Sequence, residues 1–194
     1  MTTPLDPLDP ETHDQSLDAR VRPSDEAILH RALVFAHEAL KAADVQLQRA
    51  RIEDPDLGGM AQWWIDLQFF IIALRRLRRA GELAAAVQNR GTIEDAIRDF
   101  DNALPKLGLL RNVGEHIDAY SREAGRDRSV RWRQIQVGGW DKTTFEWLGV
   151  KINADVAMAA CRRLVGWIEI VRAEEMGATE EQLREGRTLL ESKA

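Results

Sequence analysis

Residues 63–74 read WWIDLQFFIIAL, a stretch whose apolar side chains would occupy almost every side of a helix. A helix that is apolar all round packs inside a protein or inside a membrane. Three polar residues, Gln62, Asp66 and Gln68, interrupt the apolar run, which is shorter than the roughly 20 apolar residues that span a bilayer. We therefore expect a helix over about 59–86 that forms the centre of a helical bundle.

The composition predicts one globular domain. The chain has 194 residues, of which 44% are hydrophobic and 30% are charged, and this is ordinary for a protein with one substantial core. The single Cys161 excludes an internal disulfide and a cysteine-rich metal framework. The first residues lack the basic start and apolar stretch of a signal peptide, so a cytoplasmic location is expected.

The charge is unevenly distributed. The net charge of −5 argues against a general nucleic-acid coating protein, although local basic patches could still bind RNA. Residues 1–22 contain three prolines, several acidic residues and few large apolar residues, a composition typical of a disordered acidic tail. Residues 23–194 are expected to form the single folded domain.

Helix signals surround the central stretch on both sides. A helix over about 24–53 is indicated by Ser24 as its cap, and Asp54-Pro55 ends it. Its predicted buried residues are Ile28, Ala32, Phe35, Ala39 and Ala43. A third helix is expected from Gly91-Thr92, with Thr92 as a cap, to Pro105.

The second half of the chain contains the only strand signal. Between residues 130 and 152, β-branched and aromatic residues form two short runs around Gly138-Gly139, which predicts a small β-hairpin. Asn153 then caps a long helix that ends at Gly177, and a short charged helix follows. The predicted buried stripe of the long helix is Val156, Ala160, Leu164, Trp167 and Val171.

A fourth helix, expected over about 107–124, carries the candidate functional residues. Its predicted core face consists of Leu110, Val113, Ile117 and Tyr120. Arg111 and Glu115 are spaced as an i,i+4 ion pair on a second face. Asn112 and His116 lie one turn apart on a third strip beside the core edge, where an ordinary structural network and a titrating histidine are both open.

The stretch Arg111-Asn112-Val113-Gly114-Glu115-His116 resembles the Rx4-6H signature of the HEPN superfamily. HEPN proteins are all-α bundles found in toxin, antiphage and CRISPR-associated ribonucleases, and Asn commonly follows the Arg in active members. The resemblance implies a mainly α, HEPN-like helical bundle over residues 23–194, with the hairpin at about 130–152 as an insertion. Toxins of one HEPN group carry a Tyr two residues after the His, whereas this chain has Asp118 there and Tyr120 further on.

The resemblance also implies a reaction. HEPN ribonucleases need no metal or other cofactor, and cleave RNA by attack of the ribose 2′-hydroxyl on the adjacent phosphate to leave a 2′,3′-cyclic phosphate. His116 would then move a proton, Arg111 would stabilise charge on the phosphate, and Asn112 would orient a reacting group. The family further suggests a homodimer, with an antitoxin or another protein as a further partner.

One helix alone would not bring Arg111 and His116 together. Five residues of an ideal helix turn through roughly 500°, which leaves the two side chains about 140° apart. Either Arg111 lies at a non-helical N-terminus after Gly108, or a second copy completes the site across a twofold axis. The second arrangement predicts that a monomer is inactive.

Arginines and tryptophans follow the motif and could bind an RNA strand. The candidate substrate-binding residues are Tyr120, Arg122, Arg126, Arg128, Arg131 and Arg133. Nearby acidic residues partly neutralise these arginines, and the three tryptophans of the hairpin region could instead cap the bundle. A second basic group, at Arg75, Arg76, Arg78 and Arg79, is also explained by an ordinary solvated helix end.

Other functional classes have little support in the sequence. His30 and His37 share a helix face, but no third ligand accompanies them, so no metal site is expected. Glycine-rich phosphate loops, nucleophile elbows and dinucleotide fingerprints are missing from the sequence. Two hypotheses remain: a HEPN-type ribonuclease, which could be a toxin or defence effector, and a non-catalytic helical bundle that binds a protein partner.

Overall fold

The computed structural model describes residues 22–52, 62–87 and 91–191. Over these residues the chain forms eight helices and three strands, and 73% of the residues are helical. The helices are α1 (Asp25–Arg51), α2 (Gln62–Ala85), α3 (Gly91–Ala103), α4 (Leu107–Glu115), α5 (Ile117–Ser121), α6 (Trp132–Ile135), α7 (Ala154–Glu175) and α8 (Glu180–Glu191). The strands are β1 (Gly138–Trp140), β2 (Thr144–Trp147) and β3 (Val150–Asn153). The mainly helical class expected from the sequence is confirmed.

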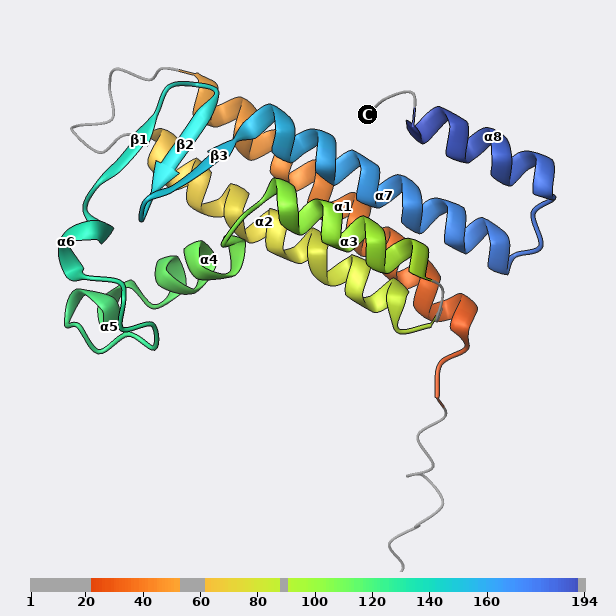
Figure 1. Ribbon diagram of the computed structural model, residues 1–194, viewed down its shortest axis with the longest axis horizontal. Helices are drawn as coiled ribbons and strands as arrows, with labels where there is room; N and C mark the ends of the chain where they lie inside the picture. The colour runs from red at the N-terminus through yellow and green to blue at the C-terminus, as the bar shows by residue number, and fades with distance from the viewer. Residues whose placement is uncertain (1–21, 53–61, 88–90, 192–194) are drawn as a thin grey trace, which may run out of the picture.

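Four long helices, α1, α2, α3 and α7, run side by side and form the body of the molecule (Figure 1). The sheet and the three short helices α4–α6 lie together at one end, and α8 folds back along α7. Helix α2 packs against α1, α3, α4 and α7, which confirms the prediction that it is the central element. Within the described residues, none of the helices combines the length and hydrophobicity that crossing a bilayer would require.

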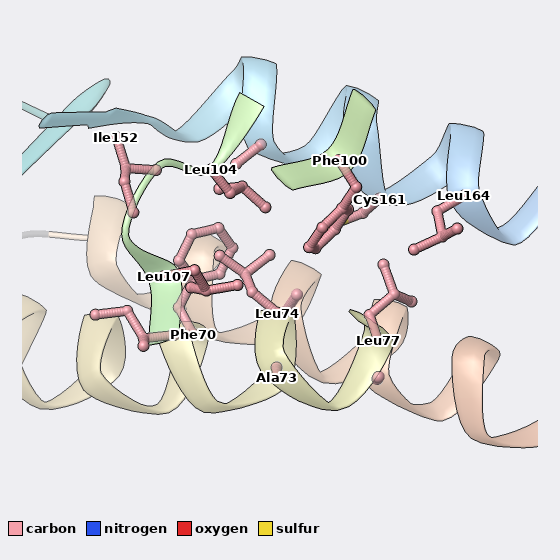
Figure 2. Packing of buried hydrophobic residues seen from close by; sticks show 14 of the residues in the cluster. Phe70, Ala73, Leu74, Leu77, Phe100, Leu104, Leu107, Ile152, Cys161 and Leu164 are labelled. Carbon is pink, nitrogen blue, oxygen red and sulfur yellow. The ribbon is translucent and has the colours of Figure 1, made fainter. Parts of the chain in front are cut away.

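The core is built around the apolar stretch of α2. Figure 2 shows Phe70, Leu74 and Leu77 of this helix facing side chains from α3, α4, α7 and β3. All the labelled residues in this view are at most 4% exposed, and burial of large apolar side chains of this kind is the main stabilising contribution in a domain. The core therefore joins the bundle to the sheet and to α4, where the candidate motif lies.

The predicted caps of α1 and α7 are confirmed, but the buried faces predicted for these two helices need correction. Ser24 accepts a hydrogen bond from an amide of the first turn of α1, and Asn153 does the same for α7. In α1, Ile28 and Phe35 are only half-buried, because the buried face is centred on the line of Leu29, Ala32, Ala36 and Ala39. In α7, Val156 is 51% exposed because the buried face is centred on Ala157, Met158, Cys161, Leu164, Val165 and Ile168.

Of three other expectations, one is corrected by the structure and two concern residues that the structure does not describe. Thr92 lies inside α3 instead of capping it, since the helix already includes Gly91. The predicted helix end at Asp54-Pro55 and the first residues expected in α2 are outside the described residues. The same holds for all but the last residue of the tail predicted over 1–22.

The region expected to be a hairpin is a three-stranded antiparallel sheet in the order β1-β2-β3, preceded by α6. Gly138-Gly139 is not the turn but part of β1, and a Cβ on Gly138 would lie 2.4 Å from the ring of Trp64. The glycine is therefore needed for close packing against α2. The tight turn lies between β2 and β3, where Leu148 and Gly149 have positive φ angles of 54° and 71°.

Candidate functional site

The helix predicted over 107–124 is broken in the middle of the candidate motif. Helix α4 ends at Glu115, His116 has the non-helical angles φ −119° and ψ 34°, and α5 begins at Ile117. Gly114 packs closely against α2, since a Cβ there would lie 2.6 Å from the amide oxygen of Gln68. The break turns Ile117 away from the core, and its exposure of 44% contradicts the core position predicted for it.

Tyr120 is the buried hub beneath the motif. Its side chain is 1% exposed, and its hydroxyl oxygen accepts hydrogen bonds from the Asn112 amide at 2.9 Å and from the backbone N–H of Asp127 at 3.2 Å. The ring also packs closely against Gly125, where a Cβ would be 2.2 Å from it. Tyr120 cannot contact a substrate from this position, so its predicted substrate-binding role is corrected to a structural one.

Arg111 lies within α4 and forms an ion pair with Glu115, the i,i+4 partner expected from the sequence. The two side chains are 30% and 33% exposed. Because α4 already begins at Leu107, the alternative of a non-helical segment after Gly108 that would swing Arg111 toward His116 is wrong. Within one chain, Arg111 is therefore part of α4, while His116 lies at the break that follows this helix.

Arg111 and Asn112 line a groove of about 640 Å³ between α2, α4 and the loop that follows α5. We call this the arginine groove. Its five arginines are Arg75 and Arg79 of α2, Arg111 of α4, and Arg126 and Arg128 of the loop. The groove therefore joins part of the motif to two basic groups that are separate in the sequence.

The charge of the arginine groove is predominantly positive. Within the part of the chain that the structure describes, Arg75, Arg79 and Arg126 form no ion pair, while Arg128 donates to the backbone carbonyl of Glu123 at 2.9 Å. The one acidic residue lining the groove is Asp127. Unpaired guanidinium groups in a concave surface attract anions, and their planar forks match the oxygens of a phosphate.

Asp127 is engaged in the loop itself. Its carboxylate accepts hydrogen bonds from the hydroxyl of Ser129 at 2.6 Å and from the backbone N–H of Ser129 at 2.9 Å. These bonds, with the hydroxyl contributing most, lower the pKa of Asp127 below its ordinary value. The carboxylate thus stabilises the local loop conformation, while the arginines on either side of it, Arg126 and Arg128, line the groove.

The other predicted substrate-binding arginines do not line the arginine groove. Arg122 pairs with Asp118 at 3.1 Å, and Arg131 lies 3.8 Å from Glu123. The guanidinium of Arg133 stacks over Trp132, 5.4 Å from the ring centroid. Their positions leave Arg126 and Arg128 as the members of that predicted set that share a concave surface with the motif.

His116 is exposed and is not among the residues that line the groove. The structure therefore brings together two of the three predicted catalytic residues, Arg111 and Asn112, and leaves the third outside. The sequence did not predict that Arg75 and Arg79 of α2 would share a groove with the motif. The signal was the i,i+4 spacing of Arg75 and Arg79, which places both guanidinium groups on one face of α2.

No known family model, curated protein or solved structure matches this chain. The assignment of a function depends on the geometry of the groove and on the motif beside it.

Two other kinds of site find no support in this geometry. Burial raises the pKa of Cys161 to about 12, so its thiol is not available as a nucleophile near neutral pH. Across the described residues, His, Cys, Asp and Glu side chains do not gather into any group of three or more that could hold a metal ion. The arginine groove remains the strongest candidate for binding a ligand.

Proposed function

We propose that the protein is a HEPN-type ribonuclease that binds RNA phosphates in the arginine groove and cleaves the strand without a metal ion. The observation that carries this proposal is the position of Arg111 and Asn112 in the wall of a groove that contains four further arginines. Phosphates supply most of the affinity between proteins and nucleic acids, and arginine is the side chain best suited to hold them. A local groove of this kind can bind RNA although the whole chain is acidic.

In the proposed reaction, the ribose 2′-oxygen forms a bond to phosphorus while the bond from phosphorus to the 5′-oxygen of the next nucleotide breaks. The 2′-hydroxyl loses its proton to a base, and the leaving 5′-oxygen gains one from an acid. Arg111 stabilises the charge that accumulates on the phosphate oxygens, and Asn112 orients the phosphate or the ribose. His116 carries one of the two proton transfers.

We further propose that His116 enters the site from a second copy of the chain. His116 is exposed at the break between α4 and α5, where an approaching surface can reach it. In a twofold dimer, His116 of each chain would face the arginine groove of the other, so that each complete site uses residues of both chains. A monomer would then bind RNA without cleaving it.

A non-catalytic bundle that binds a protein partner is the second candidate, and a specific observation favours it. Arg111 is paired with Glu115 and Asn112 is hydrogen-bonded to Tyr120, so both residues have structural roles that do not require a reaction. The exposed arginines would then recognise an acidic protein surface. In this case the resemblance of the motif to HEPN domains would carry no activity.

The decisive experiment is cleavage of a labelled single-stranded RNA in EDTA by the parent protein, Arg111→Ala and His116→Ala. Arg98→Ala is a matched control, since Arg98 pairs with Asp95 on the surface of α3 and is not among the residues that line the groove. We expect the parent and the control to release a 2′,3′-cyclic phosphate and the two motif variants to be inactive. Neither binding nor cleavage of RNA by the parent would instead favour the non-catalytic bundle that binds a protein partner.

Mixing the two inactive variants tests the composite site. In an Arg111→Ala and His116→Ala heterodimer, one site would lose both residues and the other would keep both. An equal mixture should regain about a quarter of the parent activity, because half of its dimers are mixed and each has one intact site of two. No recovery in a mixture shown to exchange subunits would rule out the shared site.

A further inference from the structure

The two sides of the arginine groove near the motif are joined through one buried side chain. Tyr120 lies below the surface, with Asn112 of α4 on one side of it and the loop 125–128 on the other. Its hydroxyl oxygen accepts from both sides, at 2.9 Å from the Asn112 amide nitrogen and 3.2 Å from the backbone nitrogen of Asp127. One atom therefore links the helix directly to the loop.

The ring of Tyr120 reinforces this connection. A Cβ added to Gly125 would lie between 2.2 and 2.6 Å from three carbons of the ring, far inside any normal contact. The loop backbone can lie directly on the ring because residue 125 is a glycine. Packing and hydrogen bonding thus hold the same short segment, from Gly125 to Asp127, against the aromatic ring.

Further hydrogen bonds that do not involve Tyr120 also hold the loop. The carboxylate of Asp127 holds Ser129, and the guanidinium of Arg128 donates to the carbonyl of Glu123. These contacts fix the backbone of the residues that carry the guanidinium groups of Arg126 and Arg128. The arginines of α2 lie on a separate helix and depend on none of them.

We propose that Tyr120 is a positioning residue of the groove: its side chain holds the loop 125–128 opposite Asn112, so that one RNA phosphate is bound from both sides. The inference rests on the proposed function, because it assumes that the groove binds the phosphates of RNA. It adds that the groove has a preformed phosphate subsite between α4 and the loop, with an independent wall on α2. A preorganised subsite binds its anion without first ordering the loop.

This arrangement predicts a specific pattern of energetic coupling. If Tyr120 positions the loop, then removal of its hydroxyl should also remove much of the benefit that Arg126 gives to binding. The same removal should leave the benefit of Arg79 unchanged, because Arg79 is on α2. A residue with a general structural role would affect both arginines alike.

The test is a double-mutant cycle with a fluorescent single-stranded 2′-O-methyl RNA, measured by anisotropy. This probe cannot be cleaved through the 2′-oxygen, so binding is measured whether or not the protein is a ribonuclease. We expect Arg126→Gln to weaken binding by about fivefold in the parent and by less than about twofold in Tyr120→Phe. Arg79→Gln should weaken binding by the same factor in both backgrounds.

The outcomes separate the two proposals. Equal effects of Arg126→Gln in both backgrounds, or equal coupling of Tyr120 to Arg126 and Arg79, would overturn the positioning role. Binding of the methylated probe with the predicted coupling, but no cleavage of ordinary RNA, would remove the ribonuclease proposal and leave the positioning role intact. A parent protein that does not bind the probe would overturn both.

Amide hydrogen exchange is measured in the unaltered protein, so its result does not depend on whether the Tyr120→Phe variant folds. The N–H of Asp127 should exchange slowly, because it is bound to a buried hydroxyl. The amides of Arg126 and Arg128 are the internal controls, since neither has an acceptor among the residues that the structure describes. Exchange of Asp127 as fast as that of its two neighbours would overturn the inference.

Discussion

The salt dependence of RNA binding offers a quantitative test of the arginine groove. Of its five arginines, Arg111 is paired with Glu115, which leaves four to neutralise phosphates. For single strands the logarithm of affinity falls by about 0.7 per neutralised phosphate for each tenfold increase in salt, which gives a slope of about −2.8. Between about 50 and 200 mM salt, affinity should therefore fall about 50-fold.

Arg75→Gln should change this slope by a defined amount. With three arginines left, the slope becomes about −2.1 and the loss of affinity over the same salt range falls to about 18-fold. The assay is fluorescence anisotropy of a labelled single-stranded RNA at four or more salt concentrations. Arg98→Gln removes the same charge from the surface of α3, where Asp95 already pairs with it, and should leave the slope unchanged.

The reasoning would be refuted by a parent slope near zero, or by equal changes in slope for Arg75→Gln and Arg98→Gln. The first result would mean that counterion release does not drive binding. The second would mean that the net charge of the whole chain matters more than the groove. Either result would favour the bundle that binds a protein partner.

Two predictions concern the scaffold. Arg49→Met should lower the free energy of unfolding, measured in urea, by about 2 kcal/mol. The reason is that the buried carboxylate of Asp66 loses the guanidinium that now lies 3.0 Å away. A loss below about 0.5 kcal/mol would contradict this prediction. Asp141 accepts the amides of Thr144 at 2.5 Å and Thr143 at 2.8 Å, which lowers its pKa below the ordinary 3.8. Its contribution to stability should therefore be complete above pH 3.8 and be lost as pH falls through the lowered pKa. The stability gap between parent and Asp141→Ala, measured in urea at several pH values, should shrink with acid, and a constant gap would refute the assignment.

The parts of the fold that follow from local sequence were predictable. The apolar run of α2 identified the central helix, and Asn153 identified the start of α7. The ion pair between Arg111 and Glu115 follows from helical spacing alone. The resemblance to HEPN domains stays a prediction, because the comparisons with known proteins do not test it.

The errors arose where tertiary contacts override local signals. Gly138-Gly139 has the composition of a turn, but the ring of Trp64 on α2 requires a residue without a side chain at Gly138. The turn instead uses Leu148 at positive φ, a conformation that is uncommon for leucine. The break at His116 and the burial of Tyr120 likewise depend on neighbours that are distant in sequence or beyond the expected helix.

The groove itself could not be derived from the sequence. Arg75 and Arg79 precede Arg126 and Arg128 by about fifty residues, and only the packing of α2 against α4 brings them to one surface. The spacing of apolar residues along the sequence indicates which face of each helix is buried, but it does not indicate which helices pack against one another. The sequence therefore supplied the candidate residues, and the fold determined which of them share a surface.

The short strands have a consequence for the behaviour of this protein at high concentration. A sheet of three strands in this order has β1 and β3 as its edge strands, and an exposed edge is a template on which other chains can assemble into aggregates. Here β1 has three residues and β3 has four, and the indole of Trp140 in β1 is tied to the carbonyl of Ala50 at the end of α1. Edges this short offer few free backbone groups, so the sheet adds little tendency to aggregate to an otherwise helical protein.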